Sequence, residues 1–182
     1  MKRLLKRMSS ARIIALGFAA VIFAGSGLLM LPCSVRDGVD LKYIDALYTS
    51  ASAVCVTGLV TVDIGDTFTA FGRFVVAALI QIGGLGVASM GAGVILAVGK
   101  RINLKGRSIL RDAMNLDSGR GIVKFLKGVF LVTVTFELVG AALSFIVFVR
   151  DYPPLKALEI SLFHSVAAFN NSGFDILGNF QS

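Results

Sequence analysis

The sequence predicts an all-α membrane protein, and three observations predict it. Hydrophobic residues make up 55% of the 182 residues and charged residues only 16%, whereas a soluble domain usually carries about a quarter charged residues. Several uncharged runs are long enough to cross a bilayer as helices. Between those runs, two shorter apolar segments recur at a fixed spacing. The same composition excludes a disordered chain, which would be poor in hydrophobic residues.

The first uncharged run, Ile13–Leu31, predicts a membrane-spanning helix. A helix of this length covers roughly 28 Å, close to the thickness of the bilayer core. Basic residues precede the run, as they do in a secretory signal. The run is nevertheless longer than the apolar region of a signal peptide, and no small-residue cleavage motif follows it. We therefore expect a retained span at about residues 13–31.

Two further runs predict the second and third spans, at about residues 74–99 and 122–149. The second run is rich in glycine, which lets helices approach closely inside a membrane. The third has Lys124 and Lys127 at its entry, where their side chains can reach the interface. Glu137 lies near the middle of that run and should face protein or water rather than lipid. Structural and functional interpretations of this intramembrane acid both remain open.

The distribution of charge predicts the orientation of the chain. The segment 32–69 carries five acidic residues against two basic ones, so it should lie outside the cell. Basic residues instead gather at the N-terminus and between the second and third spans, which should be cytoplasmic. They are Lys2, Arg3, Lys6, Arg7 and Arg12, then Lys100, Arg101, Lys105, Arg107, Arg111, Arg120 and Lys124. We expect a multi-pass protein of the plasma membrane with a cytoplasmic N-terminus.

Two apolar segments, at about residues 41–54 and 155–169, predict helices too short to cross a bilayer. A glycine-bearing stretch follows each of them. The segments align at a constant offset of 115 residues, which indicates an internal repeat. The matched pairs are Leu47 with Leu162, Ser50 with Ser165, Ala53 with Ala168, and Gly58 with Gly173. The repeated unit is a helix, a re-entrant short helix, an extended strand and a second helix.

Such a unit is suited to binding a cation through the backbone. Non-helical backbone is tolerated at membrane depth only inside protein or along a water-filled path. The C-terminal end of a short helix is partially negative, and carbonyl oxygens of an extended strand can replace the hydration shell of an ion. Neither strand carries a charged side chain before Asp63 and Asp175. The segments could also be ordinary extracellular loops, but two of them in register favour pore loops.

The sequence lacks the residue sets that metal binding, nucleophilic catalysis or nucleic-acid binding would need. Cys33, Cys55 and the single histidine, His164, do not form a set with metal-binding spacing. His164 has no evident partner for nucleophilic catalysis. The basic clusters adjoin apolar runs and are not interleaved with aromatic residues that could stack on bases. We therefore predict that the chain is not an enzyme, binds no cofactor and has no nucleic-acid partner.

Three segments carry motifs of a known family: Thr49–Leu59 (TSASAVCVTGL), Gln81–Gly86 (QIGGLG) and Phe169–Asp175 (FNNSGFD). In this order they resemble the Trk/Ktr/HKT superfamily of potassium-uptake transporters, and the closest resemblance is to the bacterial Ktr membrane subunit. The resemblance runs through essentially the whole chain. It implies a K⁺-channel-like pore of four M1–P–M2 repeats in one polypeptide, where P is a re-entrant pore loop. About one and a half of these repeats are present.

On this resemblance, residues 1–112 form the first repeat and residues 113–182 an incomplete second repeat. Gly58 and Gly173 are then the filter glycines, and K⁺ is the transported ion. The carbonyls that bind K⁺ would belong to Val56, Thr57, Asn171 and Ser172. The complete filter set is Cys55, Val56, Thr57, Gly58 and Leu59 with Asn170, Asn171, Ser172, Gly173 and Phe174.

The resemblance also implies a longer protein and further partners. Since the family has four repeats, we expect this chain to be the N-terminal part of a transporter, as a truncated product or a fragment. The full-length subunit would be a homodimer in the lipid membrane. Its cytoplasmic face would bind nucleotide-binding regulatory subunits, although the basic loop on that side is equally explained by topology and anionic lipid.

Two other functions remain to be weighed against K⁺ uptake. A non-conducting membrane scaffold or assembly protein would use the glycine-rich helix faces alone and would not need two aligned re-entrant segments. A secondary transporter with broken helices usually has longer repeats, with the breaks inside full-length spans. Both therefore explain less of the sequence.

Overall fold

The computed structural model describes residues 9–99, 102–117 and 121–179. Helices are the main secondary structure of these residues, and their only β-pairing is an isolated bridge between Val35 and Phe68. The prediction of an all-α protein is confirmed. The helices are α2 (Ser10–Leu29), α3 (Tyr43–Cys55), α4 (Ile64–Thr67), α5 (Ala70–Leu85), α6 (Val87–Ala97), α7 (Leu104–Ala113), α8 (Ile122–Phe148) and α9 (Pro154–Phe169).

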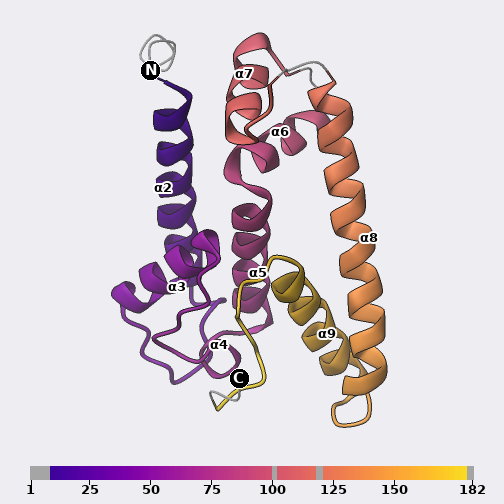
Figure 1. Ribbon diagram of the computed structural model, residues 1–182. Helices are drawn as coiled ribbons and strands as arrows, with labels where there is room; N and C mark the ends of the chain where they lie inside the picture. The colour runs from indigo at the N-terminus through magenta and orange to yellow at the C-terminus, as the bar shows by residue number, and fades with distance from the viewer. Residues whose placement is uncertain (1–8, 100–101, 118–120, 180–182) are drawn as a thin grey trace.

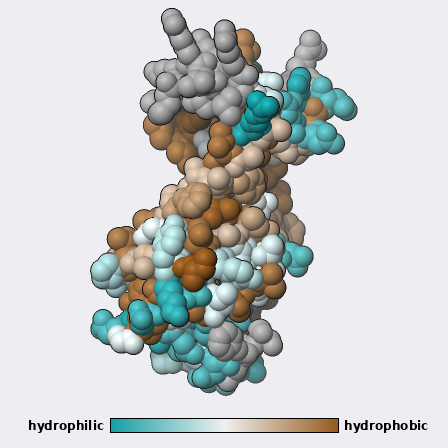
Figure 2. Space-filling view, turned by 90° about the vertical axis from the view of Figure 1, so that its left-hand side faces the viewer, coloured by the Kyte–Doolittle hydropathy of each residue, from teal (hydrophilic) through white to brown (hydrophobic). Residues whose placement is uncertain are grey.

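Long apolar helices give the molecule its membrane character. Among the described residues, α2 and α8 are each long and apolar enough to cross a bilayer, and α5 with α6 passes the same test only as a bent pair. The helices α2, α5 and α8 stand side by side (Figure 1). The shorter α9 lies between α5 and α8, and α3 packs against α2 and α5. Hydrophilic residues gather toward the two ends, and a hydrophobic waist lies between them (Figure 2). The chain is a membrane protein.

The second apolar run is not the single straight helix that the sequence led us to expect. Its first part is α5, its second part is α6, and the two axes meet at 105°. Gly86 forms the break, with φ +83° and ψ 135°, a backbone conformation that is open essentially to glycine alone. An uninterrupted apolar sequence contains no charge or proline that would mark such a bend.

Two hydrophobic clusters hold the helices together. The larger one joins α3, α5 and α9 around Val54, Val76, Ile80 and Ile160. The smaller one joins α6, α7 and α8 at the other end of the molecule, around Leu110 and other buried aliphatic side chains. The larger cluster therefore places the C-terminal ends of both short helices against α5.

A polar contact fixes α7 beside the start of α2. The hydroxyl of Ser10 donates to Oδ2 of Asp112 over 2.5 Å. This hydrogen bond, together with the neighbouring Arg111, lowers the pKa of Asp112 below its ordinary value. The interaction therefore favours the ionised carboxylate and is lost as acid protonates it.

The break at Gly86 gives a first prediction. Gly86→Ala should destabilise the bent pair by about 1–3 kcal/mol, because an alanine side chain is strained at this positive φ. No neighbouring atom crowds the position, since a Cβ would meet only Ser89 Oγ at 3.9 Å, so the loss would come from the backbone. The melting temperature of the purified protein in detergent measures it.

The matched control is Gly91→Ala in α6, where a Cβ would have no neighbour within 4 Å. This change should leave the melting temperature unchanged or raise it, since alanine favours a helix. Equal melting temperatures for the two variants would show that Gly86 does not determine the bend.

Candidate functional site

The short helices α3 and α9 end in the same way. Val56 and Asn171 each follow the last helical turn with φ +54°, in the left-handed region. The next amide of each segment donates back to its helix, Thr57 N to Ser52 O over 3.0 Å and Ser172 N to Ala167 O over 2.9 Å. These six-to-one bonds are those of a Schellman motif, which satisfies carbonyls at a helix C-terminus. The 115-residue offset thus extends to individual backbone hydrogen bonds.

Val56 is an unusual residue for this conformation. A β-branched side chain with positive φ is a genuine outlier, and a left-handed non-glycine residue costs roughly 1–2 kcal/mol. Asparagine, at the equivalent position 171, tolerates the conformation more easily. The strained backbone at Val56 therefore marks the end of α3 as a segment that the surrounding structure holds in place.

The two glycines of the predicted filter lie against each other. Gly58 has φ +71° and Gly173 has φ +73°. A Cβ built on Gly58 would collide with the carbonyl oxygen of Ser172, and one built on Gly173 would lie 3.5 Å from Gly58 Cα. Two segments 115 residues apart therefore meet backbone to backbone. A Cβ at Gly58 would require a shift, whereas one at Gly173 would make an ordinary contact and be disfavoured by its positive φ.

Side chains around the glycines differ between the two segments. Leu59 is 59% exposed, whereas its counterpart Phe174 is 3% exposed and packs in the larger hydrophobic cluster. Cys55 is exposed and its thiol is free. The hydroxyls of Thr57 and Ser172 bond back toward their own helices. The common feature of the two segments is therefore the course of their backbone.

The end of α9 is fastened to α5 by a side-chain amide. Asn170 donates from Nδ2 to Gln81 Oε1 over 2.8 Å and to Val166 O over 2.9 Å. A Cβ on Gly84 would collide with Asn170 Oδ1, so glycine makes room for this contact. Gln81 opens the QIGGLG motif, but the sequence alone indicated no role for its side chain.

Glu137, the intramembrane acid of α8, lines a cavity of about 530 Å³ between α5, α8 and α9. Most of the lining is apolar, and Gln81, Arg73 and Glu159 are its other large polar residues. The Oε1 atom of Glu137 has no hydrogen-bond partner among the described residues. Glu137 thus faces a mostly apolar cavity beside α9.

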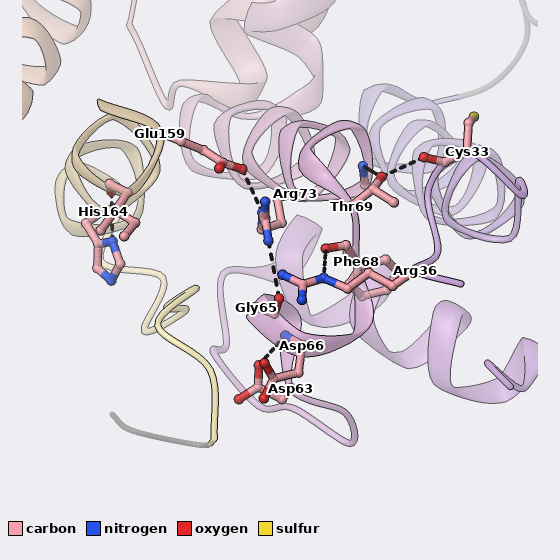
Figure 3. Close-up of polar contacts among 12 residues, drawn as sticks. Cys33, Arg36, Asp63, Gly65, Asp66, Phe68, Thr69, Arg73, Glu159 and His164 are labelled. Carbon is pink, nitrogen blue, oxygen red and sulfur yellow. Dashed lines mark hydrogen bonds and ion pairs between the residues drawn. The ribbon is translucent and has the colours of Figure 1, made fainter. Parts of the chain in front are cut away.

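An ion pair joins α5 to α9. Arg73 of α5 donates from Nε to Glu159 Oε1 of α9 over 2.7 Å and from Nη1 to the carbonyl of Gly65 over 3.2 Å (Figure 3). Arg73 is 9% exposed. The partners lie 86 residues apart, so the sequence analysis could not pair them. His164, in the same view, bonds through Nδ1 to Ile160 O of its own helix over 2.8 Å.

This architecture defines a class of protein: a membrane pore protein built from repeated helix–pore loop–helix units. Residues 5–180 match the TrkH family, described as cation transport protein, and the chain belongs to that family. The predicted resemblance to the Trk/Ktr superfamily is confirmed.

Several relatives are similar along nearly the whole chain. Identity is 41% over 170 residues with Ktr system potassium uptake protein B of Bacillus subtilis, covering 93% of this chain and 38% of that protein. It is 37% over 178 residues with potassium/sodium uptake protein NtpJ of Enterococcus hirae, covering 98% and 40%. It is 34% over 172 residues with Ktr system potassium uptake protein B of Vibrio alginolyticus, covering 92% and 36%. The chain therefore spans about two fifths of the length of these relatives.

The ion pair gives a second prediction. Glu159→Gln should lower stability by about 1–2 kcal/mol, because it leaves the mostly buried Arg73 without a counter-charge. The effect stays below that of a fully buried pair, since the Glu159 side chain is 30% exposed and partly screened by solvent. The melting temperature in detergent measures the loss.

Asp40→Asn is the matched control for Glu159→Gln, because it removes the same charge from an exposed residue. It should leave the melting temperature nearly unchanged. If both substitutions lowered stability equally, total charge rather than the contact with Arg73 would be the cause.

Proposed function

We propose that this chain forms part of the ion-translocating pore of a K⁺ uptake protein. The observation that carries the proposal is the meeting of two identically terminated short helices at Gly58 and Gly173. The proposed ligands are the carbonyl oxygens of Val56, Thr57, Asn171 and Ser172, with K⁺ as the transported ion and no catalytic role. Cys55, Leu59, Asn170 and Phe174 would complete the two filter segments.

Backbone conformation supports this assignment. The cap hydrogen bonds use the amides of Val56, Thr57, Asn171 and Ser172 as donors, which leaves the carbonyls of the same residues for another partner. Inside a membrane such carbonyls need a partner, and a dehydrated cation is one. The hydroxyls of Thr57 and Ser172 already bond toward their helices, so the backbone is the better ligand. The names of the relatives, which are potassium or potassium/sodium uptake proteins, favour a monovalent cation.

The same proposal implies the repeat boundaries, the rest of the pore and the partners of the protein. Repeat one would comprise residues 1–112 and repeat two would begin at residue 113. The complete pore would contain further repeats, and the full-length subunit would be a homodimer in the plasma membrane. Nucleotide-binding regulatory subunits would bind on the cytoplasmic side, which would also hold the N-terminus. A non-conducting scaffold remains the alternative, and it has no use for the close contact between Gly58 and Gly173.

The glycine pair gives the third prediction. Replacing either glycine with alanine should weaken the preference for K⁺ over Na⁺, because selectivity is a small difference between two site energies and about 1.4 kcal/mol already changes it tenfold. Gly58→Ala should have the larger effect, since its Cβ would collide with the Ser172 carbonyl, whereas the Cβ of Gly173→Ala meets Gly58 Cα at 3.5 Å.

Uptake is best measured in a chimera in which residues 5–180 replace the matching segment of the Bacillus subtilis Ktr system protein B. The host strain lacks its own K⁺ transporters, and K⁺ and Na⁺ uptake are compared at equal membrane expression. Gly38→Ala is the matched control, because Gly38 also has a positive φ, +82°, but no neighbour that its Cβ would meet. Unchanged selectivity in both filter variants would contradict the pore assignment and favour the scaffold.

Membrane orientation gives the fourth prediction. With Cys33 and Cys55 replaced, Asp37→Cys should react with a membrane-impermeant maleimide on intact cells, and Leu104→Cys should react only after the cells are opened. Both positions are exposed, Leu104 to 86%, so accessibility depends on the side of the membrane. Labelling of position 104 on intact cells would reverse the proposed orientation.

A further inference from the structure

Each short helix is bound to its neighbouring long helix by a buried serine. Ser50 of α3 donates from Oγ to the carbonyl of Ile22 in α2 over 2.7 Å. Ser165 of α9 donates from Oγ to the carbonyl of Glu137 in α8 over 2.6 Å. Donors and acceptors are both 115 residues apart, so the two hydrogen bonds are equivalent under the internal repeat. Ser50 is fully buried and Ser165 is 7% exposed.

A glycine faces each of these serines. A Cβ on Gly25 of α2 would lie 2.5 Å from Ser50 Oγ, and a Cβ on Gly140 of α8 would lie 2.5 Å from Ser165 Oγ. The two glycines are again 115 residues apart, each three residues after its acceptor. Without a side chain at that point, the short helix approaches closely enough for the hydroxyl to reach a carbonyl of the long helix.

Ser50 and Ser165 do not form the hydrogen bond within their own helix that is common for serine. In a helix, a serine hydroxyl commonly bonds to the carbonyl four residues earlier, as Ser161 of α9 does with Ala157 O over 2.7 Å. Ser165, one turn further on, instead bonds across to α8. The acceptor is a backbone atom, which explains why Ile22 and Glu137 can differ in chemistry while the contact is the same.

We propose that Ser50 and Ser165 are positioning residues of the ion site. Each serine packs against its facing glycine, and its hydrogen bond fixes the position of the short helix along the axis of the adjacent long helix. Gly58 and Gly173 each follow their serine by eight residues, so a shift of either helix changes the distance between the two glycine-bearing strands. The inference rests on the proposed function, since it takes those strands to be the ion ligands.

The second repeat offers the cleaner test, because Gly25 also faces Leu79 whereas Gly140 has no close neighbour except Ser165. In the chimera, Ser165→Ala should reduce K⁺ over Na⁺ selectivity by roughly threefold or more, in line with the strength of hydrogen bonds between membrane helices. Ser161→Ala removes a hydroxyl from the same helix without an inter-helix bond and should leave selectivity unchanged.

A second pair of variants tests the contact itself. Gly140→Ala should reduce uptake strongly, because its Cβ would collide with the serine hydroxyl. Adding Ser165→Ala removes that hydroxyl and leaves the Ser165 Cβ at 3.5 Å, so the double variant should transport better than Gly140→Ala alone. Gly128→Ala, on the same helix with no neighbour within 4 Å, should behave like the unaltered protein.

The outcomes separate this inference from the proposed function. If the filter variants change selectivity but Ser165→Ala matches Ser161→Ala and the double variant shows no recovery, the positioning role is overturned and the pore assignment stands. If the filter variants have no effect, the pore assignment fails. In that case the melting temperatures of the Gly140→Ala, Ser165→Ala and double variants still show whether the two positions are coupled. If the two single effects simply add in the double variant, the contact between Gly140 and Ser165 is overturned as well.

Discussion

On the proposed pore assignment, α3 and α9 end inside the membrane, where no water satisfies the last carbonyl groups of a helix. The rest of the structure depends on how the two helices meet that constraint. Each helix turns through one left-handed residue, Val56 or Asn171, and closes with a six-to-one hydrogen bond. The strain of a left-handed valine is offset by the cap hydrogen bonds that this conformation permits. The chain can then leave each helix in an extended form, with its next carbonyls unused by the cap.

Backbones must approach closely for this arrangement to exist, and glycine provides the space. Gly83 and Gly84 of α5 receive the ends of α3 and α9, where any Cβ would collide with Val54 or Asn170. Between membrane helices there is little hydrophobic driving force, so packing and hydrogen bonds determine the association. Gly25, Gly83, Gly84 and Gly140 are therefore positioned where the short helices touch the long ones.

The parts that the sequence predicted are those determined by local composition. Apolar runs identify α2 and α8, and the repeat offset identifies the related short helices. The bend at Gly86 could not be predicted, because a glycine in a continuous apolar run does not reveal its own φ. The pairing of Arg73 with Glu159 depends on how two repeats pack. Ser50 and Ser165 were aligned correctly, but their acceptors lie on other helices. The assignment of the filter residues and of Glu137 stays a prediction.

Differences between the two repeats bear on which atoms could bind an ion. A site made of side chains would need equivalent donors at 55–59 and 170–174, yet the segments share only glycine and a hydroxyl residue that bonds back to its own helix. The remaining side chains fit their separate surroundings, as Asn170 fits beside Gln81 and Phe174 fits the hydrophobic cluster. Because the backbone is what the repeats have in common, a ligand bound equally by both must be bound by carbonyl oxygens. Such a ligand set accords with the proposed binding of a dehydrated cation.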